Sequence, residues 1–155
     1  MIGERLSVGE ICTRVVTIAF GPTSLGDAAR LMRENHVGAL VVVEDRDDRR
    51  VVVGVLTDRD IVTAAVARDQ DPRRMCVADI MSTDLVTADE DESVVDLLRI
   101  MRSKGVRRVP VIGAGADLIG IVTLDDVLDI LSQELALVVA AIDSEGRRER
   151  QRLRA

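Results

Sequence analysis

A seven-residue pattern, Gly-x-x-Thr-x-x-Asp, occurs twice in the chain and is its clearest candidate for a ligand-binding motif. The two copies comprise Gly54, Thr57 and Asp60, and Gly120, Thr123 and Asp126. A hydroxyl and a carboxylate one helical turn apart can hold a phosphate or a ribose, and the free N–H groups of a helix N-terminus favour anions. The glycine falls in an apolar strand, where it usually marks the close approach of a ligand or of another backbone.

The Thr and the Asp of this pattern also have a purely structural interpretation. A Thr at an N-cap with an acidic residue three positions later resembles a capping box, and negative charge favours the positive end of a helix dipole. Capping explains Thr57 and Asp60 but leaves the repeated glycine unexplained. The pattern by itself is therefore compatible with both a ligand site and helix capping.

Few other residues predict chemistry. His36, the single histidine, aligns with Gly105 at the end of a predicted helix, which favours a capping role. Cys12 and Cys76 lie far apart without a CxxC motif, so they are most simply small buried hydrophobes, with redox sensing as the alternative. No GxSxG, Walker or GxGxxG pattern is present. We therefore expect no catalytic residue, no metal site and no enzymatic activity.

The composition of the 155-residue chain narrows the classes of partner. There are 27 Asp+Glu against 21 Lys+Arg, a formal net charge of −6, and one Phe with no Tyr or Trp. Nucleic-acid sites depend on positive charge and aromatic platforms, so we expect no nucleic-acid partner. No apolar run reaches transmembrane length and the N-terminus lacks a signal-peptide core, which predicts a cytoplasmic protein without a membrane partner. The abundance of Arg over Lys is typical of a GC-rich bacterial genome.

Both copies of the pattern belong to a longer internal repeat, whose elements must position them. Ser24–Arg33 aligns without a gap onto Ser93–Arg102, and Val53–Ile61 aligns onto Ile119–Val127 after a shorter loop. Each copy predicts a β-α-β-β-α unit in which a serine caps the first helix and the pattern threonine opens the second. The expected strands lie around Val16-Thr17, Ala39–Glu44 and Val51–Leu56, and around Val86-Thr87, Arg108–Ile112 and Leu118–Val122.

We therefore expect an α/β (α+β) fold of two units. A single sheet face cannot bury itself, so the two units should pack face to face and share a core. The predicted boundaries are 8–68 for the first unit, 69–76 for a polar linker, 77–134 for the second unit and 135–155 for a helical extension with an Arg-rich tail.

The stretches GVLTDRDI, MRSKGVRRVPVI and GIVTLDDVL resemble the most recognisable parts of the cystathionine-β-synthase (CBS) domain family. The span from about Val8 to Leu131 resembles a tandem CBS pair, the Bateman module. This resemblance implies a pseudo-twofold between the units and two clefts that bind AMP, ADP, ATP or S-adenosylmethionine. In the family, the motif Thr and Asp contact phosphate and ribose, and the first strand and the start of the second line the adenine.

Carried over by position, the resemblance assigns two sites. The first would comprise Val16, Thr17, Gly38, Ala39, Thr57, Arg59 and Asp60. The second would comprise Val86, Thr87, Arg107, Arg108, Val109, Pro110, Thr123 and Asp126. Because guanidinium groups suit phosphate, the second site is expected to bind phosphorylated ligands more tightly, unless its arginines are simply solvated at the start of a strand.

The last helix predicts a partner. Its apolar stripe continues beyond the repeat; the stripe comprises Leu124, Val127, Leu128, Leu131, Leu135, Val138, Val139 and Ile142. Up to about Leu131 it can pack on its own unit, and beyond that point we expect a homodimer interface. The alternatives are that the extension folds back onto its own two units or binds an unknown protein target. We expect a regulatory module sensing an adenosine-containing ligand, with a structural or protein-interaction module with vestigial clefts as the alternative.

Overall fold

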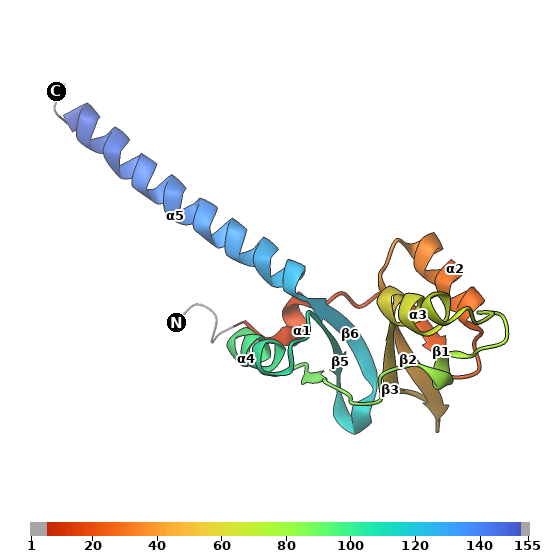
Figure 1. Cartoon of the computed structure of the whole chain (residues 1–155). Coiled ribbons are helices and arrows are strands. Elements are labelled where there is room, and N and C mark those ends of the chain that lie inside the picture. Colours follow the sequence, from red (N-terminus) through yellow and green to blue (C-terminus); the bar gives the residue numbers. More distant parts are fainter. Residues whose placement is uncertain (1–5, 153–155) are drawn as a thin grey trace.

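The structure, a computed structural model, describes residues 6–152 as two small α+β units and one long helix that leaves them (Figure 1). In the first unit, β1 (Ile18–Phe20) is parallel to β2 (Ala39–Arg46), which is antiparallel to β3 (Arg49–Thr57). In the second unit, β4 (Ala88–Asp89), β5 (Arg108–Ile112) and β6 (Leu118–Thr123) repeat this topology. The predicted pair of mixed α/β units is confirmed.

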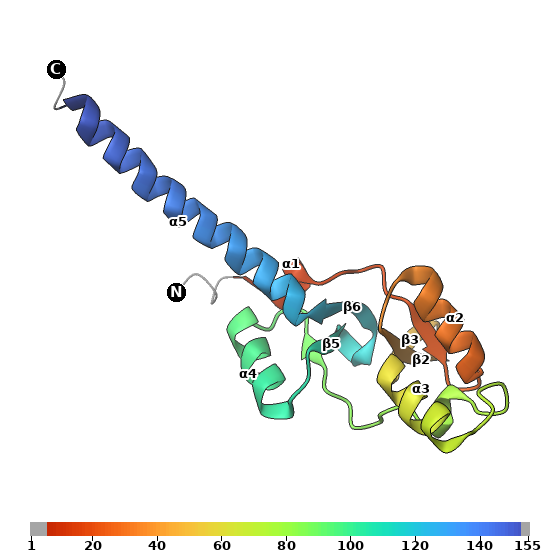
Figure 2. The same ribbon diagram turned by 45° about the horizontal axis from the view of Figure 1, so that its top comes forward.

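Helices cover one side of each sheet (Figure 2). The longer helices are α2 (Leu25–Asn35) and α3 (Asp58–Ala64) in the first unit, and α4 (Val94–Lys104) and α5 (Leu124–Arg152) in the second. The short ones are α1 (Val8–Ile11) and the 3₁₀ turns η2 (Val66–Arg68), η3 (Val77–Asp79) and η4 (Ala114–Ala116).

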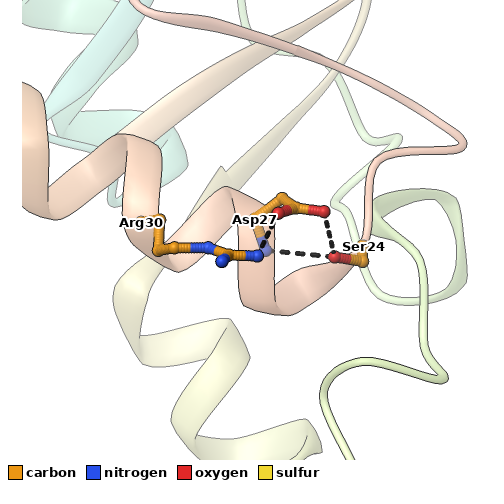
Figure 3. A network of polar contacts seen from close by, with 3 residues as sticks. All are labelled: Ser24, Asp27 and Arg30. Atoms are coloured by element: carbon orange, nitrogen blue, oxygen red, sulfur yellow. Dashed lines mark hydrogen bonds and ion pairs between the residues drawn. The ribbon is translucent and has the colours of Figure 1, made fainter.

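The predicted serine caps are present at the first helix of each unit. The Ser24 hydroxyl accepts a hydrogen bond from the backbone N–H of Asp27 at 3.1 Å, and the Asp27 carboxylate contacts both Ser24 and Arg30 (Figure 3). Ser93 and Asp96 repeat this arrangement on α4. The serine hydroxyls, helped by the neighbouring arginines, lower the pKa of Asp27 and of Asp96. The caps fix where both helices begin.

Three apolar clusters hold the units together. One fills the first unit around Leu25, Leu40 and Leu56, and one fills the second unit around Leu97 and Val122. The third joins the two sheets, and it comprises Val41, Val43 and Val52 with Val16, Ile18, Ile112, Leu118 and Ile121 packed against them. This shared cluster is the expected face-to-face core.

The segments that lead into each unit are exchanged. Val8, on α1 at the start of the first repeat, is fully buried in the core of the second unit, and the N–H of Val8 donates to Glu92 at 2.8 Å. Val77 is fully buried in the core of the first unit, and its N–H donates to Thr23 at 2.8 Å. Each unit is therefore completed by the segment that precedes the other unit in the sequence.

Three local expectations were wrong. The first strand of each unit begins at Ile18 or Ala88, two residues later than predicted. The loop expected over 45–50 is instead a two-residue turn, because Asp47 and Asp48 both adopt positive φ (48° and 63°) and so form the turn that matches the twist of a β-hairpin. Aspartate tolerates this left-handed backbone better than most residues, and both strands are consequently longer.

The final helix differs from the expectation in where its exposed stripe begins. α5 is continuous over 29 residues, about 43 Å at 1.5 Å per residue, and it projects away from both units (Figures 1 and 2). Val127 is buried, but Leu128 and Leu131 are already 54% and 50% exposed. The stripe therefore leaves its own unit one turn earlier than predicted, and the helix does not fold back. Residues 153–155 of the predicted Arg-rich tail, including Arg154, lie outside the described residues.

Candidate functional site

Both copies of the Thr–Asp pattern form complete capping boxes. The N–H of Thr57 donates to Asp60 Oδ2 at 2.8 Å, the Thr57 hydroxyl donates to the same oxygen at 2.6 Å, and the N–H of Asp60 donates back to that hydroxyl at 3.2 Å. Thr123 and Asp126 repeat these contacts at 2.7, 2.8 and 3.2 Å. The structural role considered for these residues is thus real.

Capping leaves part of each carboxylate available. All of the capping contacts use Oδ2, and within residues 6–152 the other oxygen, Oδ1, of Asp60 and of Asp126 has no hydrogen-bond partner. Both side chains are half-buried at the N-terminal end of a helix. Each capping box therefore holds a carboxylate oxygen in a fixed position where it can accept from a hydroxyl of a bound molecule.

The repeated glycine has a different cause from the threonine and the aspartate. A Cβ on Gly120 would lie 2.8 Å from the Thr13 carbonyl oxygen and 2.7 Å from the Cys12 sulfur. A Cβ on Gly54 would meet Met81 at 2.7 Å and the Ser82 carbonyl oxygen at 3.1 Å. Of the two causes considered from the sequence, the close approach is that of another backbone rather than of a ligand.

These close approaches result from the exchanged segments. Thr13 pairs with Ile121 through two backbone hydrogen bonds of 2.9 Å, and Ser82 pairs with Val55 at 2.9 and 3.1 Å. Each segment therefore adds a bridge to the free edge of the other unit's sheet. The glycines make room for this bridge, so they support the clefts indirectly.

A cleft of about 580 Å³ opens at the N-terminal end of α3, and we name it the α3 cleft. The first unit contributes the motif residues Thr57 and Asp60 with Arg59. The second unit contributes Val86, Arg107 and Arg108. The remaining lining residues are Val55, Asp58, Ser82, Asp84, Gly105 and Val106. Its size falls within the range of small-molecule sites.

A smaller cleft of about 280 Å³ opens at the N-terminal end of α5, and we name it the α5 cleft. Here the second unit contributes the motif residues Thr123 and Asp126. The first unit contributes four of the residues predicted for its own site, namely Val16, Thr17, Gly38 and Ala39. The remaining lining residues are Thr13, Val15, His36, Val37, Arg108, Ile121 and Asp125.

The structure groups the predicted residues differently from the expectation. Each cleft takes its Thr–Asp pair from one unit and its strand residues from the other, whereas the sequence assignment kept each unit's residues together. The reason is the face-to-face packing, which places the helix start of one unit opposite the first strands of its neighbour. Arg107 consequently lies with Asp60 in the α3 cleft and not with Asp126.

Arg108 is common to both clefts. One of its guanidinium nitrogens lies 3.4 Å from the position that a Cβ on Gly38 would occupy, and the Asp58 carboxylate lies 3.2 Å from the same position. Arg107 lines only the α3 cleft, and its guanidinium forms an exposed ion pair with the Asp125 carboxylate at 3.6 Å. The α3 cleft thus has three arginines on its walls and the α5 cleft has one.

Three residues predicted for the second site line neither the α3 cleft nor the α5 cleft. The Val109 side chain is fully buried in the core of the second unit. Pro110 is buried within β5, and Thr87 precedes β4 without reaching the cleft walls.

Sequence reasoning also missed several lining residues. Asp84 and Ser82 belong to the segment after the linker, and Asp58 and Asp125 follow the motif threonines. The last two could have been found, because each directly follows or nearly follows a motif threonine at a helix start.

The remaining polar candidates have structural roles. His36 caps the end of α2 in the left-handed conformation (φ 54°), as its alignment with Gly105 (φ 66°) predicted. Cys12 packs against the core of the second unit, and burial raises the pKa of its thiol. Within residues 6–152, no group of three or more His, Cys, Asp or Glu side chains is arranged to hold a metal ion. Over the same residues, no helix is both long enough and apolar enough to cross a membrane.

Comparison with protein families gives two matches to the CBS domain, over residues 8–67 and 77–133. The uncharacterized protein MK0525 of Methanopyrus kandleri is 32% identical over 150 residues, covering 97% of this chain and 73% of that protein. Hypoxic response protein 1 of Mycobacterium tuberculosis is 37% identical over 118 residues, covering 76% of this chain and 80% of that protein.

Solved structures show the same architecture. The crystal structure of Hypoxic Response Protein I with two coordinated zinc ions has a TM-score of 0.70 and 35% identity, covering 80% of this chain and 98% of that one. The CBS domain pair of MJ0100, in complex with 5'-methylthioadenosine and S-adenosyl-L-methionine, has a TM-score of 0.73 and 25% identity, covering 83% and 98%. A hexameric CBS-CP12 protein from bloom-forming cyanobacteria has a TM-score of 0.69 and 31% identity, covering 79% and 69%.

Proposed function

Because this chain belongs to the CBS-domain family as a tandem pair of such domains, we propose that it is a non-enzymatic regulatory module that binds an adenosine-containing ligand in its clefts. The candidate ligands are AMP, ADP, ATP and S-adenosylmethionine. The module then acts in the cytoplasm as a ligand or energy sensor, and it works as a homodimer or through a protein target.

The observation that carries this proposal is the composition of each cleft from two unlike halves. One half is a helix start with a half-buried Thr–Asp pair whose Asp Oδ1 is available to accept from a hydroxyl. The other half consists of residues of the neighbouring unit that lie just before or at the start of a strand, such as Val86 or Ala39, together with Arg108. A molecule with a ribose, a flat apolar ring and an anionic group is complementary to such a cleft.

The charges on the walls favour phosphorylated ligands in the α3 cleft. On the walls of that cleft three arginines balance three aspartates, whereas the smaller α5 cleft has one arginine against two aspartates. The residues are Arg59, Arg107 and Arg108 with Asp58, Asp60 and Asp84 in the α3 cleft, and Arg108 with Asp125 and Asp126 in the α5 cleft. Guanidinium groups bind phosphate through strong, often bidentate hydrogen bonds. We therefore propose that ATP or ADP prefers the α3 cleft, and that the α5 cleft takes a ligand with few phosphates or none. The methylthioadenosine and S-adenosylmethionine bound to the MJ0100 pair are ligands of this second kind.

The experiment that tests the proposal is a ligand screen on the whole chain by melting temperature and calorimetry. A ligand present at 100 times its dissociation constant stabilises the folded state by about 2.7 kcal/mol, which a melting curve resolves. Asp60→Asn and Asp126→Asn, which keep the size of the side chain, report which cleft is occupied. If AMP, ADP, ATP and S-adenosylmethionine all leave the melting curve and the heat of mixing unchanged, the alternative of an interaction module without a functional cleft is favoured instead.

A further inference from the structure

The apolar stripe of α5 is uncovered over four helical turns. Leu128, Leu131, Leu135, Val138 and Ile142 are between 50% and 64% exposed, although all five are large aliphatic side chains. Both views show the helix leaving the two units without meeting another element beyond its first turns (Figures 1 and 2). An apolar strip of this size on one face usually marks an interface.

The spacing of the stripe indicates what kind of surface covers it. The five positions alternate in steps of three and four residues, which is the seam of a coiled coil. The flanking Val139, 52% exposed, widens the seam on one side. A seam of this kind is covered by another helix with the same spacing, and a second copy of α5 provides one.

The charges along α5 set the relative direction of the two helices. Its first eleven residues hold four carboxylates and no basic residue, and its last six residues hold four arginines and one glutamate. A parallel pair would place acidic beside acidic and basic beside basic. We propose that α5 pairs with α5 of a second copy in antiparallel orientation, which separates the basic ends of the two helices. The acidic start of each helix then lies beside residues 136–145 of the other, where Asp143 and Glu145 are the only charged residues, so fewer like charges meet than in a parallel pair. This inference rests on the homodimer proposed above and defines its surface.

Symmetry then determines which residues meet. The seam from Leu128 to Ile142 has its midpoint at Leu135, so an antiparallel pair centred there places Leu128 of one copy opposite Ile142 of the other. Residue 147 lies twelve positions beyond the midpoint and comes level with residue 123. In this register Asp125, which is 74% exposed at the rim of the α5 cleft, is level with position 145 of the other copy, a glutamate. The partner's Arg147 lies two positions further along and is the arginine of the basic end that comes nearest to Asp125.

The oligomeric state tests whether the stripe is the interface. Leu135→Asp places a charge at the centre of the seam, and Leu137→Asp makes the same change on the opposite face of the helix, where Leu137 is 72% exposed. Leu135 is 64% and Leu137 is 72% exposed, so both variants should fold with nearly unchanged melting temperature. We expect sedimentation to give a dimer for the unchanged chain and for Leu137→Asp, and a monomer for Leu135→Asp. A monomeric unchanged chain at tens of micromolar, or a dimeric Leu135→Asp, would overturn the proposal.

Disulfide cross-linking tests the orientation, in a background with Cys12→Ala and Cys76→Ala. Leu128→Cys and Ile142→Cys chains are oxidised separately and after mixing. Antiparallel pairing gives a cross-link only in the mixture, joining one chain of each kind. A cross-link in the Leu128→Cys chain alone would show parallel helices and overturn the orientation. Leu137→Cys should cross-link in no combination.

The failure of this proposal is distinguishable from that of ligand binding. The adenine-nucleotide shift in melting temperature is measured on the unchanged chain and on Leu135→Asp in parallel. If the unchanged chain is a monomer whose melting temperature still rises with nucleotide, the ligand proposal stands and only the helix pairing is wrong. If the unchanged chain is a dimer whose melting temperature rises with none of the ligands, the helix pairing stands and the ligand proposal is wrong.

Discussion

Replacing Arg108 by alanine should weaken ligand binding in both clefts, although only one side chain is changed. Arg108 is the arginine that lines both the α3 and the α5 cleft. Its side chain is exposed and forms no ion pair within residues 6–152, so the variant should change the unfolding free energy of the unliganded protein by no more than about 0.5 kcal/mol.

The size of the effect follows from the contact that is lost. A hydrogen bond to a charged group is worth about 1.5–3 kcal/mol, and each 1.4 kcal/mol is a tenfold change in dissociation constant. A phosphate held by Arg108 should therefore bind roughly 10- to 100-fold more weakly in Arg108→Ala. Adenosine, which has no phosphate, should bind with nearly unchanged affinity. Because one guanidinium serves two clefts, the two binding events in the unchanged protein should also oppose each other.

Calorimetric titrations with ATP, ADP and adenosine measure these quantities, and Arg59→Ala is the matched variant. Arg59 lines only the α3 cleft, so its loss should weaken one binding event and leave the other unchanged. An Arg102→Ala control changes an exposed arginine on α4 that lines neither cleft. Equal weakening of ATP and adenosine by Arg108→Ala, or a loss confined to one cleft, would refute the shared role.

Three further predictions concern stability and reactivity. Gly120→Ala should destabilise the fold by roughly 1–3 kcal/mol in urea unfolding, because its Cβ would lie 2.7 Å from the Cys12 sulfur, whereas Gly26→Ala on α2 meets nothing closer than 3.8 Å and should be neutral or stabilising. Asp27 and Asp96 have pKa values lowered below their ordinary 3.8, so their stabilisation is complete above that pH and is lost as the pH falls further. Melting curves between about pH 2 and 6, a range that spans the pKa of a free aspartate, should show this loss of stability. The double variant Asp27→Asn with Asp96→Asn should lose less stability on acidification, and an equal loss in the variant and the unchanged chain would contradict the prediction. Because burial raises the pKa of its thiol, Cys12 should react with iodoacetamide at neutral pH more slowly in the folded than in the unfolded chain, and equal rates would contradict this.

Local features of the fold could be predicted from the sequence because their partners are close along the chain. Ser24 and Asp27 are three residues apart, as are Thr57 and Asp60, and in each pair the predicted cap is present. The β5 range Arg108–Ile112 was also predicted correctly, since a short apolar run between turn residues leaves little choice.

The composition of each cleft could not be predicted in the same way. The repeat aligns Val16 with Val86 and Thr57 with Thr123, but an alignment does not say which unit lies opposite which. Only the packing of the two sheets places Val16 beside Thr123 and Val86 beside Thr57. The error in grouping therefore arose from a long-range contact, and most of the predicted residues line one cleft or the other.

The exchanged lead segments have a consequence for the ancestry of this chain. Val8 fills the core of the second unit and Val77 fills that of the first, each fully buried. A single copy of the repeat would expose this valine and leave a vacancy in its own core, and both defects disappear when two copies trade segments. If duplication of one gene segment produced the repeat, two identical single-copy chains would have completed both cores by the same exchange of their leading segments. Joining the two copies in one chain converts an association that depends on concentration into one that does not.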